Sequence, residues 1–260
     1  MAIRQVTVGV DGSLTAVRAL DRAAEEAVLR GATLAIVYAV PDVDIAGPVL
    51  ASAVLRVGRR CPDLAVTALA VAGNPVRALE RHARHAELTV VGARALGPLA
   101  GLLLGSVSRR LAARIRGPLL VVRGDQVVGG GEVLLWPSKG ADADAAAFAF
   151  AEAERRRTPV RVLDGEPAGC GPARRSAPGR PAAAPGDGTN RPTPDRRGPS
   201  HRARRGPSHR AGRGLLEATH GAGLVVISGR GHRGLPADAA TRALLRHSHC
   251  PVVIVPDGTA

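Results

Sequence analysis

The stretch Val90-Val91-Gly92-Ala93-Arg94-Ala95-Leu96-Gly97, followed by Gly101-Leu102-Leu103-Leu104-Gly105-Ser106-Val107-Ser108, decides the fold. It predicts a buried strand, a glycine-rich loop and then a helix that opens with Gly105-Ser106. A helix N-terminus carries unpaired backbone N–H groups and a partial positive charge. Because glycine has no side chain, an anion can approach those groups closely. The stretch therefore predicts a binding site for an anion such as a phosphate group.

The same order of strand, loop and helix extends on both sides of this stretch. Apolar runs predict strands at residues 3–10, 33–40, 64–71, 88–91 and 119–123. Helical spacing of apolar residues predicts helices at 15–30, 49–60, 73–86 and 106–116. Turn and cap signals separate them, because Asp11-Gly12-Ser13 starts the first helix and Gly31 ends it.

Strands that are apolar throughout and alternate with helices favour a parallel sheet covered on both faces. Right-handed crossovers then give a doubly wound α/β fold with a five-stranded sheet in the order 3-2-1-4-5. In such sheets ligands bind beyond the carboxyl ends of the strands, where the strand order reverses. Asp11 follows strand 1 and Gly92 ends strand 4, so both fall at this switch point.

The second half of the chain repeats this plan incompletely. Strands are expected at 132–136, 159–163, 224–228 and 252–255, and helices at 142–157, 215–222 and 241–248. The end of each half is similar, since Gly117-Pro118-Leu119-Leu120-Val121-Val122 corresponds to Cys250-Pro251-Val252-Val253-Ile254-Val255. The pattern indicates an internal duplication of a domain-sized unit whose second copy is incomplete.

Residues 165–213 fit neither copy and are predicted to be a disordered insertion. They are rich in Gly, Pro, Arg and Ser and contain the tandem octapeptide Arg196–Ala203 and Arg204–Ala211. Few large apolar residues are available there to offset the entropy of ordering the chain. Residues 165–214 hold eleven arginines against Glu166, Asp187 and Asp195, a net charge of +8 out of +14 for the whole chain.

Composition points to a cytoplasmic protein without a membrane span or a metal centre. Cys61, Cys170 and Cys250 are odd in number and far apart, which argues against a disulfide framework. The N-terminus lacks the apolar core of a signal peptide, and no apolar run reaches the ~20 residues that span a bilayer. Aromatic residues make up only 2% of the chain, so the core must consist of Ala, Val, Leu and Ile.

These motifs resemble the universal stress protein family in its tandem two-domain form. The family's nucleotide pattern is Gly, two residues, Gly, nine residues, Gly and then Ser or Thr. Here it corresponds to Gly92, Ala95 and Gly105-Ser106. Val-Gly-Val-Asp-Gly-Ser at 8–13 also resembles the family's first strand and turn. The resemblance implies a nucleotide-binding domain at 1–124 and a degenerate second domain at 131–164 and 214–257.

The resemblance further implies that the first domain binds ATP, with Mg²⁺, as a sensor or regulator of a stress response. Asp11 would lie near the ribose or the metal ion, and the backbone of Ala39 would contact adenine. The phosphates would lie against Gly92, Ala95 and the helix start, whose residues are Gly105, Ser106, Val107 and Ser108. The last strands, 119–123 and 252–255, would pair within the chain or in a homodimer.

Two departures from the family pattern affect these expectations. Ala95 replaces the second glycine, and a positive φ there would cost alanine roughly 1 kcal/mol or more, so ATP binding in the first domain is expected to be weakened. The second domain has Trp136-Pro137-Ser138 where Asp11 stands in the first, and Ser228 replaces its first glycine. We therefore expect no nucleotide in the second domain.

Other functions are compatible with parts of the sequence. No general base accompanies Ser106, so an enzyme is not expected. The alternative is a nucleotide-free interaction protein whose basic segment 165–213 contacts nucleic acid or acidic partners. That segment has no aromatic residue for base stacking. Three interpretations of the segment remain open: a functional basic arm, a neutral insertion, or a stretch read out of frame. Nucleotide binding created only by Ala95→Gly would favour the alternative.

Overall fold

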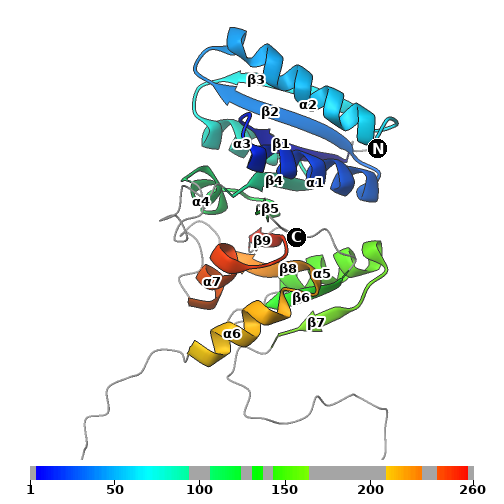
Figure 1. Cartoon of the computed structure of the whole chain (residues 1–260), viewed down its shortest axis with the longest axis vertical. Coiled ribbons are helices and arrows are strands. Elements are labelled where there is room, and N and C mark those ends of the chain that lie inside the picture. Colours follow the sequence, from blue (N-terminus) through cyan, green and yellow to red (C-terminus); the bar gives the residue numbers. More distant parts are fainter. Residues whose placement is uncertain are drawn as a thin grey trace, which may run out of the picture.

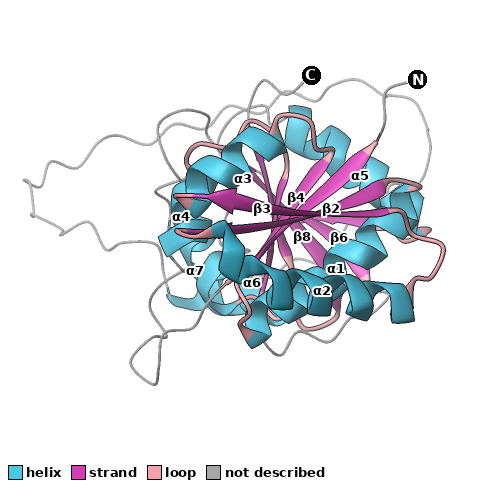
Figure 2. Ribbon diagram, turned by 90° about the horizontal axis from the view of Figure 1, so that it is seen from above, coloured by secondary structure: helices cyan, strands magenta, loops and turns pink. Residues whose placement is uncertain are grey.

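The computed structural model describes residues 4–93, 106–123, 131–136, 143–163, 209–229 and 239–256. Within these residues, strands join into one nine-stranded sheet with the order β3-β2-β1-β4-β5-β9-β8-β6-β7 (Figure 1). Figure 2 shows that the sheet is strongly twisted and that helices surround it. The predicted α/β fold with a mainly parallel sheet is confirmed.

The first half of the chain has the predicted strand order 3-2-1-4-5. Its strands are β1 (Gln5–Val10), β2 (Thr33–Val40), β3 (Val66–Ala72), β4 (Leu88–Gly92) and β5 (Leu119–Val122). Its helices are α1 (Leu14–Arg30), the 3₁₀ turn η1 (Val43–Ala46), α2 (Gly47–Arg60), α3 (Pro75–Ala83) and α4 (Ser106–Ala112). Every neighbouring pair of these strands is parallel.

The second half repeats part of this arrangement. Its strands are β6 (Glu132–Trp136), β7 (Val160–Val162), β8 (Ala222–Gly229) and β9 (Val252–Pro256). Its helices are α5 (Ala143–Arg156), α6 (His209–Ala218) and α7 (Ala239–His247). These strands are also parallel to one another, in the order β9-β8-β6-β7. Among the described residues, no strand of this half takes the place that β3 has in the first.

The two halves share one sheet because their last strands pair. β5 and β9 run antiparallel, with Leu119 opposite Ile254 and Val121 opposite Val252. All four side chains are buried. The last strands were expected to pair within the chain or in a dimer, and in this structure they pair within the chain.

Local signals in the sequence define the ends of two helices. At α1 the hydroxyl of Ser13 accepts a hydrogen bond from the N–H of Ala16, and Gly31 ends the helix with a φ of 58°. At α3 the side chain of Asn74 accepts hydrogen bonds from the N–H groups of Val76 and Arg77. These are the N-cap and C-cap interactions that satisfy backbone groups left unpaired at helix ends.

Small aliphatic residues fill two apolar layers, one on each face of the sheet. One layer joins α1, α2 and α5 to the sheet, with alanines such as Ala19, Ala23 and Ala149 fully buried. The other joins α3, α4, α6 and α7 to the opposite face through residues such as Leu79, Leu111 and Leu244. The small alanine side chains allow helices and strands to approach closely, in agreement with the low aromatic content.

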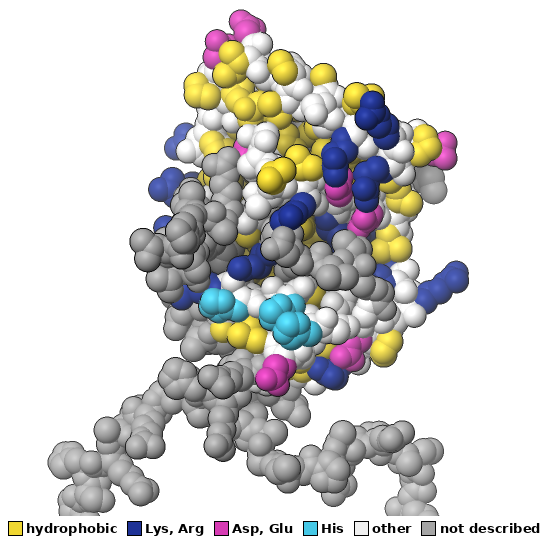
Figure 3. Space-filling view, in the orientation of Figure 1, with side chains coloured by type: hydrophobic (Ala, Val, Ile, Leu, Met, Phe, Trp, Pro, Cys, Tyr) yellow, Lys and Arg dark blue, Asp and Glu magenta, His cyan; other side chains and the backbone are white. Residues whose placement is uncertain are grey.

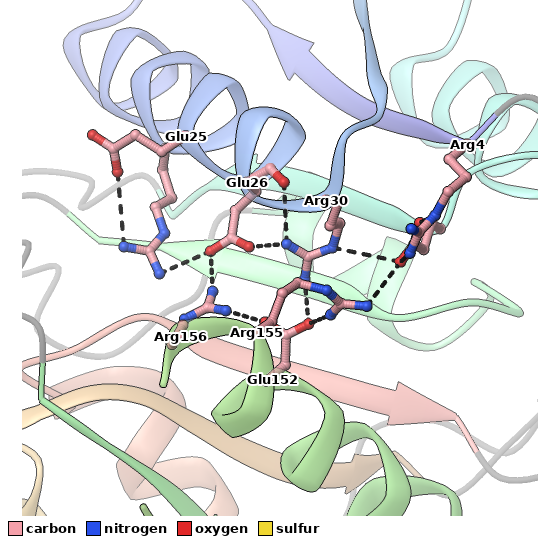
Figure 4. Close-up of polar contacts among 9 residues, drawn as sticks. Arg4, Glu25, Glu26, Arg30, Glu152, Arg155 and Arg156 are labelled. Atoms are coloured by element: carbon pink, nitrogen blue, oxygen red, sulfur yellow. Dashed lines mark hydrogen bonds and ion pairs between the residues drawn. The ribbon is translucent and has the colours of Figure 1, made fainter. Parts of the chain in front are cut away.

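A buried network of ion pairs links α1 to α5 (Figure 4). Glu26 of α1 and Glu152 of α5 are almost completely inaccessible to solvent. Arg30 of α1 and Arg156 of α5 each contact both carboxylates. Arg22 adds a contact of 2.8 Å to Glu26. Because an unpaired buried charge is strongly unfavourable, each partner in the network depends on the others.

The network sets the ionisation of Glu26. Burial by itself raises the pKa of this carboxyl group, but the charges of Arg22, Arg30 and Arg156 outweigh burial. Together they lower the pKa of Glu26 from 4.5 to about 2. The ionised form is therefore the one that the folded protein stabilises.

The edge strand β3 is not covered on both faces. The expectation of a sheet covered on both faces is therefore wrong at this strand. Five of its seven residues are exposed, and Leu69 retains 38% of its accessible surface. The reason is that α3 packs over β1, β2 and β4, so it leaves one face of β3 open. Figure 3 shows hydrophobic side chains gathered at this end of the molecule.

The helix α6 also differs from expectation. It begins at His209, inside the segment predicted to be disordered, and ends at Ala218 instead of residue 222. The N–H groups of Thr219 and His220 donate to the carbonyls of Leu216 and Glu217, which closes the helix early. Ala222 then starts β8. Residues 164–208 lie outside the described residues.

We predict that Glu26→Gln lowers the free energy of unfolding and removes part of its pH dependence. The folded-state pKa of Glu26 is depressed, so its contribution is complete above pH 4.5 and is lost as the pH falls toward 2. The stability difference between wild type and variant should be about 2 kcal/mol smaller at pH 3 than at pH 6. Urea unfolding at the two pH values measures this difference.

Glu25→Gln is the matched control, because Glu25 is half-exposed and lies 3.9 Å from Arg22. This change should alter stability by less than about 1 kcal/mol at either pH. Equal pH dependence in wild type and Glu26→Gln would contradict the assignment.

Candidate functional site

A pocket lies at the carboxyl ends of β1, β2 and β4, where the strand order of the first half reverses. Its volume is about 160 Å³. The residues around it come from these strands, the start of α1, α3 and the start of α4. They are Gly9, Val10, Asp11, Ser13, Thr15, Ala16, Val37, Ala39, Pro75, Leu79, Val91, Gly92, Val107 and Ser108.

The lining changes from apolar to polar across the sheet. Val37 and Ala39 of β2 and Pro75 and Leu79 of α3 form an apolar side. Asp11, Ser13 and Thr15 follow β1, and Ser108 lies on α4, so hydroxyl and carboxylate groups form the other side. Such a pocket is suited to a ligand with one flat apolar part and one strongly polar part.

A tight turn at the start of α1 holds the polar side together. The carboxylate of Asp11 accepts hydrogen bonds from the backbone N–H of Ser13 at 3.0 Å and from its hydroxyl at 2.5 Å. The Ser13 hydroxyl lies 3.1 Å from that of Thr15 and caps α1 at the N–H of Ala16. Asp11 is the only ionisable side chain among the described lining residues, and it lies beside the positive end of the α1 dipole.

Ser108 joins α4 to the end of β4. Its hydroxyl is buried and donates a hydrogen bond to the carbonyl of Gly92 at 3.0 Å. In this structure the hydrogen of the Ser108 hydroxyl is thus used in a bond to the protein's own backbone, and contact of Ser108 with a phosphate stays a prediction. Ser108 fixes the position of the α4 start relative to the sheet.

The backbone of Thr15 lies so close to Gly92 that a side chain on residue 92 would overlap it. A Cβ atom on this residue would lie 2.7 Å from the carbonyl oxygen of Thr15. Gly9 is similarly close to α3, since a Cβ there would lie 2.8 Å from a methyl group of Leu79. The missing side chains let α1 and α3 pack tightly around the pocket. The sequence motif predicts room for phosphates at Gly92, and it gives no sign of the close approach of Thr15.

The structure brings together five of the residues predicted for the site: Asp11, Ala39, Gly92, Val107 and Ser108. Ser106 begins α4, but its side chain lies outside the described part of the chain. Ala95 and Gly105 also lie outside the described residues.

Sequence reasoning missed Thr15, Val37, Pro75 and Leu79 as pocket residues. Thr15 and Pro75 stand at the first turn of a helix, and both helix starts were predicted. Val37 and Leu79 resemble ordinary core residues, so nothing local distinguishes them. Their role comes from the packing of α3 over β2.

Two further properties describe the molecule around the site. Among the described residues no group of three or more His, Cys, Asp or Glu side chains could hold a metal ion. Within the same residues, no helix has the length and apolar character required to cross a membrane.

We predict that Gly92→Ala destabilises the protein by about 1–3 kcal/mol, because the added methyl group would overlap backbone atoms of Thr15. Gly58→Ala is the matched control. Gly58 lies in α2, where a Cβ meets nothing within 4 Å, so alanine there should raise stability by up to about 1 kcal/mol. Chemical denaturation of both variants measures the two changes, and equal effects would refute the close contact at Gly92.

Comparison with known proteins places this geometry in a family. The sequence profile of the universal stress protein family matches residues 2–123. A universal stress protein of Mycobacterium tuberculosis is 36% identical over 132 residues, which is 45% of this chain and 44% of that protein. The chain thus spans less than half the length of the curated relatives that it matches.

Solved structures extend the comparison. A universal stress protein in complex with cAMP is 31% identical, over 47% of this chain and 98% of its own, with a TM-score of 0.40. For a universal stress protein from Archaeoglobus fulgidus the comparison covers 98% of this chain and 98% of its own, with a TM-score of 0.67 at 12% identity, so the two share the same fold. The chain belongs to the universal stress protein family.

Proposed function

We propose that the first half of the chain binds an adenine nucleotide, ATP with Mg²⁺, and acts as a sensor or regulator in a stress response. One observation carries the proposal: the pocket at the switch point of the sheet has an apolar side on β2 and α3 and a polar side on β1, α1 and α4. The base of a nucleotide suits the first side, and its ribose and phosphates suit the second. The 31% identical relative solved with cAMP supports an adenine ligand.

The residues of the pocket fit the parts of such a ligand. Val37, Ala39 and Leu79 offer aliphatic contacts to the flat base. The positive end of the α1 dipole lies beside the polar side of the pocket and favours negative charge there. A Mg²⁺ ion bound with the nucleotide would neutralise phosphate charge, and the oxygens of Asp11 and Ser13 are the kind of ligand that it prefers.

The second half is proposed to have no nucleotide of its own. Its β6 ends at Trp136, and no carboxylate follows there in the sequence as Asp11 follows β1. We therefore propose one site per chain, with the second half as a structural partner.

The test is isothermal titration of the full chain with Mg-ATP, beside a titration with cAMP. Ala39→Leu should weaken binding at least tenfold, because the larger side chain fills the apolar side of a pocket of about 160 Å³. Ala70→Leu, at an exposed position on β3, is the matched control and should bind as wild type does. A folded wild-type protein without saturable binding of either ligand would contradict the proposal.

A second variant tests the role of the carboxylate. Asp11→Asn retains the oxygen that accepts from Ser13 but removes the negative charge. If Asp11 helps to hold the metal ion, wild type should bind ATP more tightly with Mg²⁺ than with a chelator, and the variant should lose this difference. An unchanged response to Mg²⁺ would assign Asp11 to the turn alone.

A further inference from the structure

A second polar feature lies on the side of α3 that faces away from the nucleotide pocket. Arg77, Arg81 and Arg84 recur at helical spacing and are all exposed. With Arg114, which follows α4, they line an open groove of about 690 Å³. The remaining lining residues are Ala72, Gly73, Asn74 and Glu80. We name this feature the α3 arginine groove.

Among the described residues, the groove has more positive than negative side chains. Four guanidinium groups face one carboxylate, that of Glu80. Within the described ranges, no ion pair joins any of the four arginines to an acidic side chain. The contrast with α2 is clear, because Arg56 there bonds both oxygens of Asp21 and Arg60 lies 3.6 Å from Glu25. Basic side chains also project along the edge of the molecule near α3 in Figure 3.

A neighbouring group experiences this positive charge. His82 lies on α3 beside Arg81, and its pKa is lowered by burial and then by the charges of Arg81 and His85. The charge of Arg81 thus disfavours a further positive charge at His82, in agreement with the excess of arginine in the groove.

The chemistry of the groove favours one kind of anion. Among the described residues that line the groove, Ala72 is the only one with an apolar side chain, and none is aromatic. Interfaces between proteins depend on buried apolar and aromatic anchors, which this groove lacks. Guanidinium groups pair with phosphate in a bidentate manner, and contacts to phosphate need no apolar anchor.

The spacing of the arginines matches a phosphate backbone. From Arg77 to Arg84 the helix rises by about 10 Å. One strand of a duplex carries a phosphate every ~3.4 Å along its axis, so this distance covers about three phosphates. We propose that the α3 arginine groove binds the phosphate backbone of nucleic acid without sequence preference. This surface belongs to the folded first half and is separate from the basic segment 165–213.

The test is fluorescence anisotropy of a labelled 20-base-pair DNA duplex with the full-length protein over a range of salt concentrations. The variant Arg77→Gln/Arg81→Gln/Arg84→Gln should weaken binding at least tenfold at low salt. The slope of log affinity against log salt should become shallower by about 2.7, the value for three lost phosphate contacts. A duplex of unrelated sequence should bind equally well.

The matched control is Arg56→Gln/Arg59→Gln/Arg60→Gln, which removes the same charge from the exposed side of α2 on the other face of the sheet. It should retain most of the affinity and the salt slope. Both variants keep segment 165–213, so its contribution cancels, and circular dichroism shows whether each protein is folded.

Four results would overturn the proposal. The first is that the wild type binds no duplex. The second is that the α3 variant keeps wild-type affinity and salt slope, which would assign binding to segment 165–213. The third is that the α2 control loses as much affinity as the α3 variant, which would indicate a general effect of net charge. The fourth is that poly-glutamate displaces the labelled duplex as well as unlabelled DNA does at equal charge, which would indicate an acidic protein partner.

Discussion

The antiparallel pairing of β5 with β9 is the interaction on which the rest of the structure depends. Without it, each half would expose an edge of unpaired backbone groups and apolar side chains. With it, Leu119 and Ile254 lie in the interior of a continuous sheet. The same arrangement brings α1 near α5, which allows the buried contacts of Arg30 and Arg156 with both carboxylates. One backbone pairing therefore accounts for the sheet, the continuous core and the ion network.

Much of the fold can be predicted from local patterns. Apolar runs and helical spacing located the strands and helices of the first half, and Gly31 ended α1 as its αL preference requires. Interactions between distant residues could not be predicted. Glu26 and Arg156 are 130 positions apart, and each resembles an ordinary surface residue of a helix. The exposure of β3 depends on where α3 lies, and the early end of α6 depends on hydrogen bonds at Thr219 and His220.

The site shows the same division between local and distant information. Spacing and context predicted that Asp11 and Gly92 would meet, because carboxyl ends of parallel strands share one edge of the sheet. The roles of the individual residues within the site could not be predicted from the sequence, because they depend on contacts between distant elements. Gly92 leaves room for the carbonyl of Thr15, and the hydroxyl of Ser108 donates a hydrogen bond to the carbonyl of Gly92. A motif of this kind therefore combines residues that could contact a ligand with residues that shape the pocket.

The shared sheet also has a thermodynamic consequence. If the two halves unfold as one cooperative unit, a ligand that binds only the first half raises the stability of both, by an amount set by its concentration and affinity. Conversely, a destabilising substitution near β8 or α7 would lower the fraction of molecules with an intact pocket, although none of the described residues of these two elements lines it. If the second half binds no nucleotide, as proposed, it would then influence occupancy of the pocket only through the stability of the shared fold.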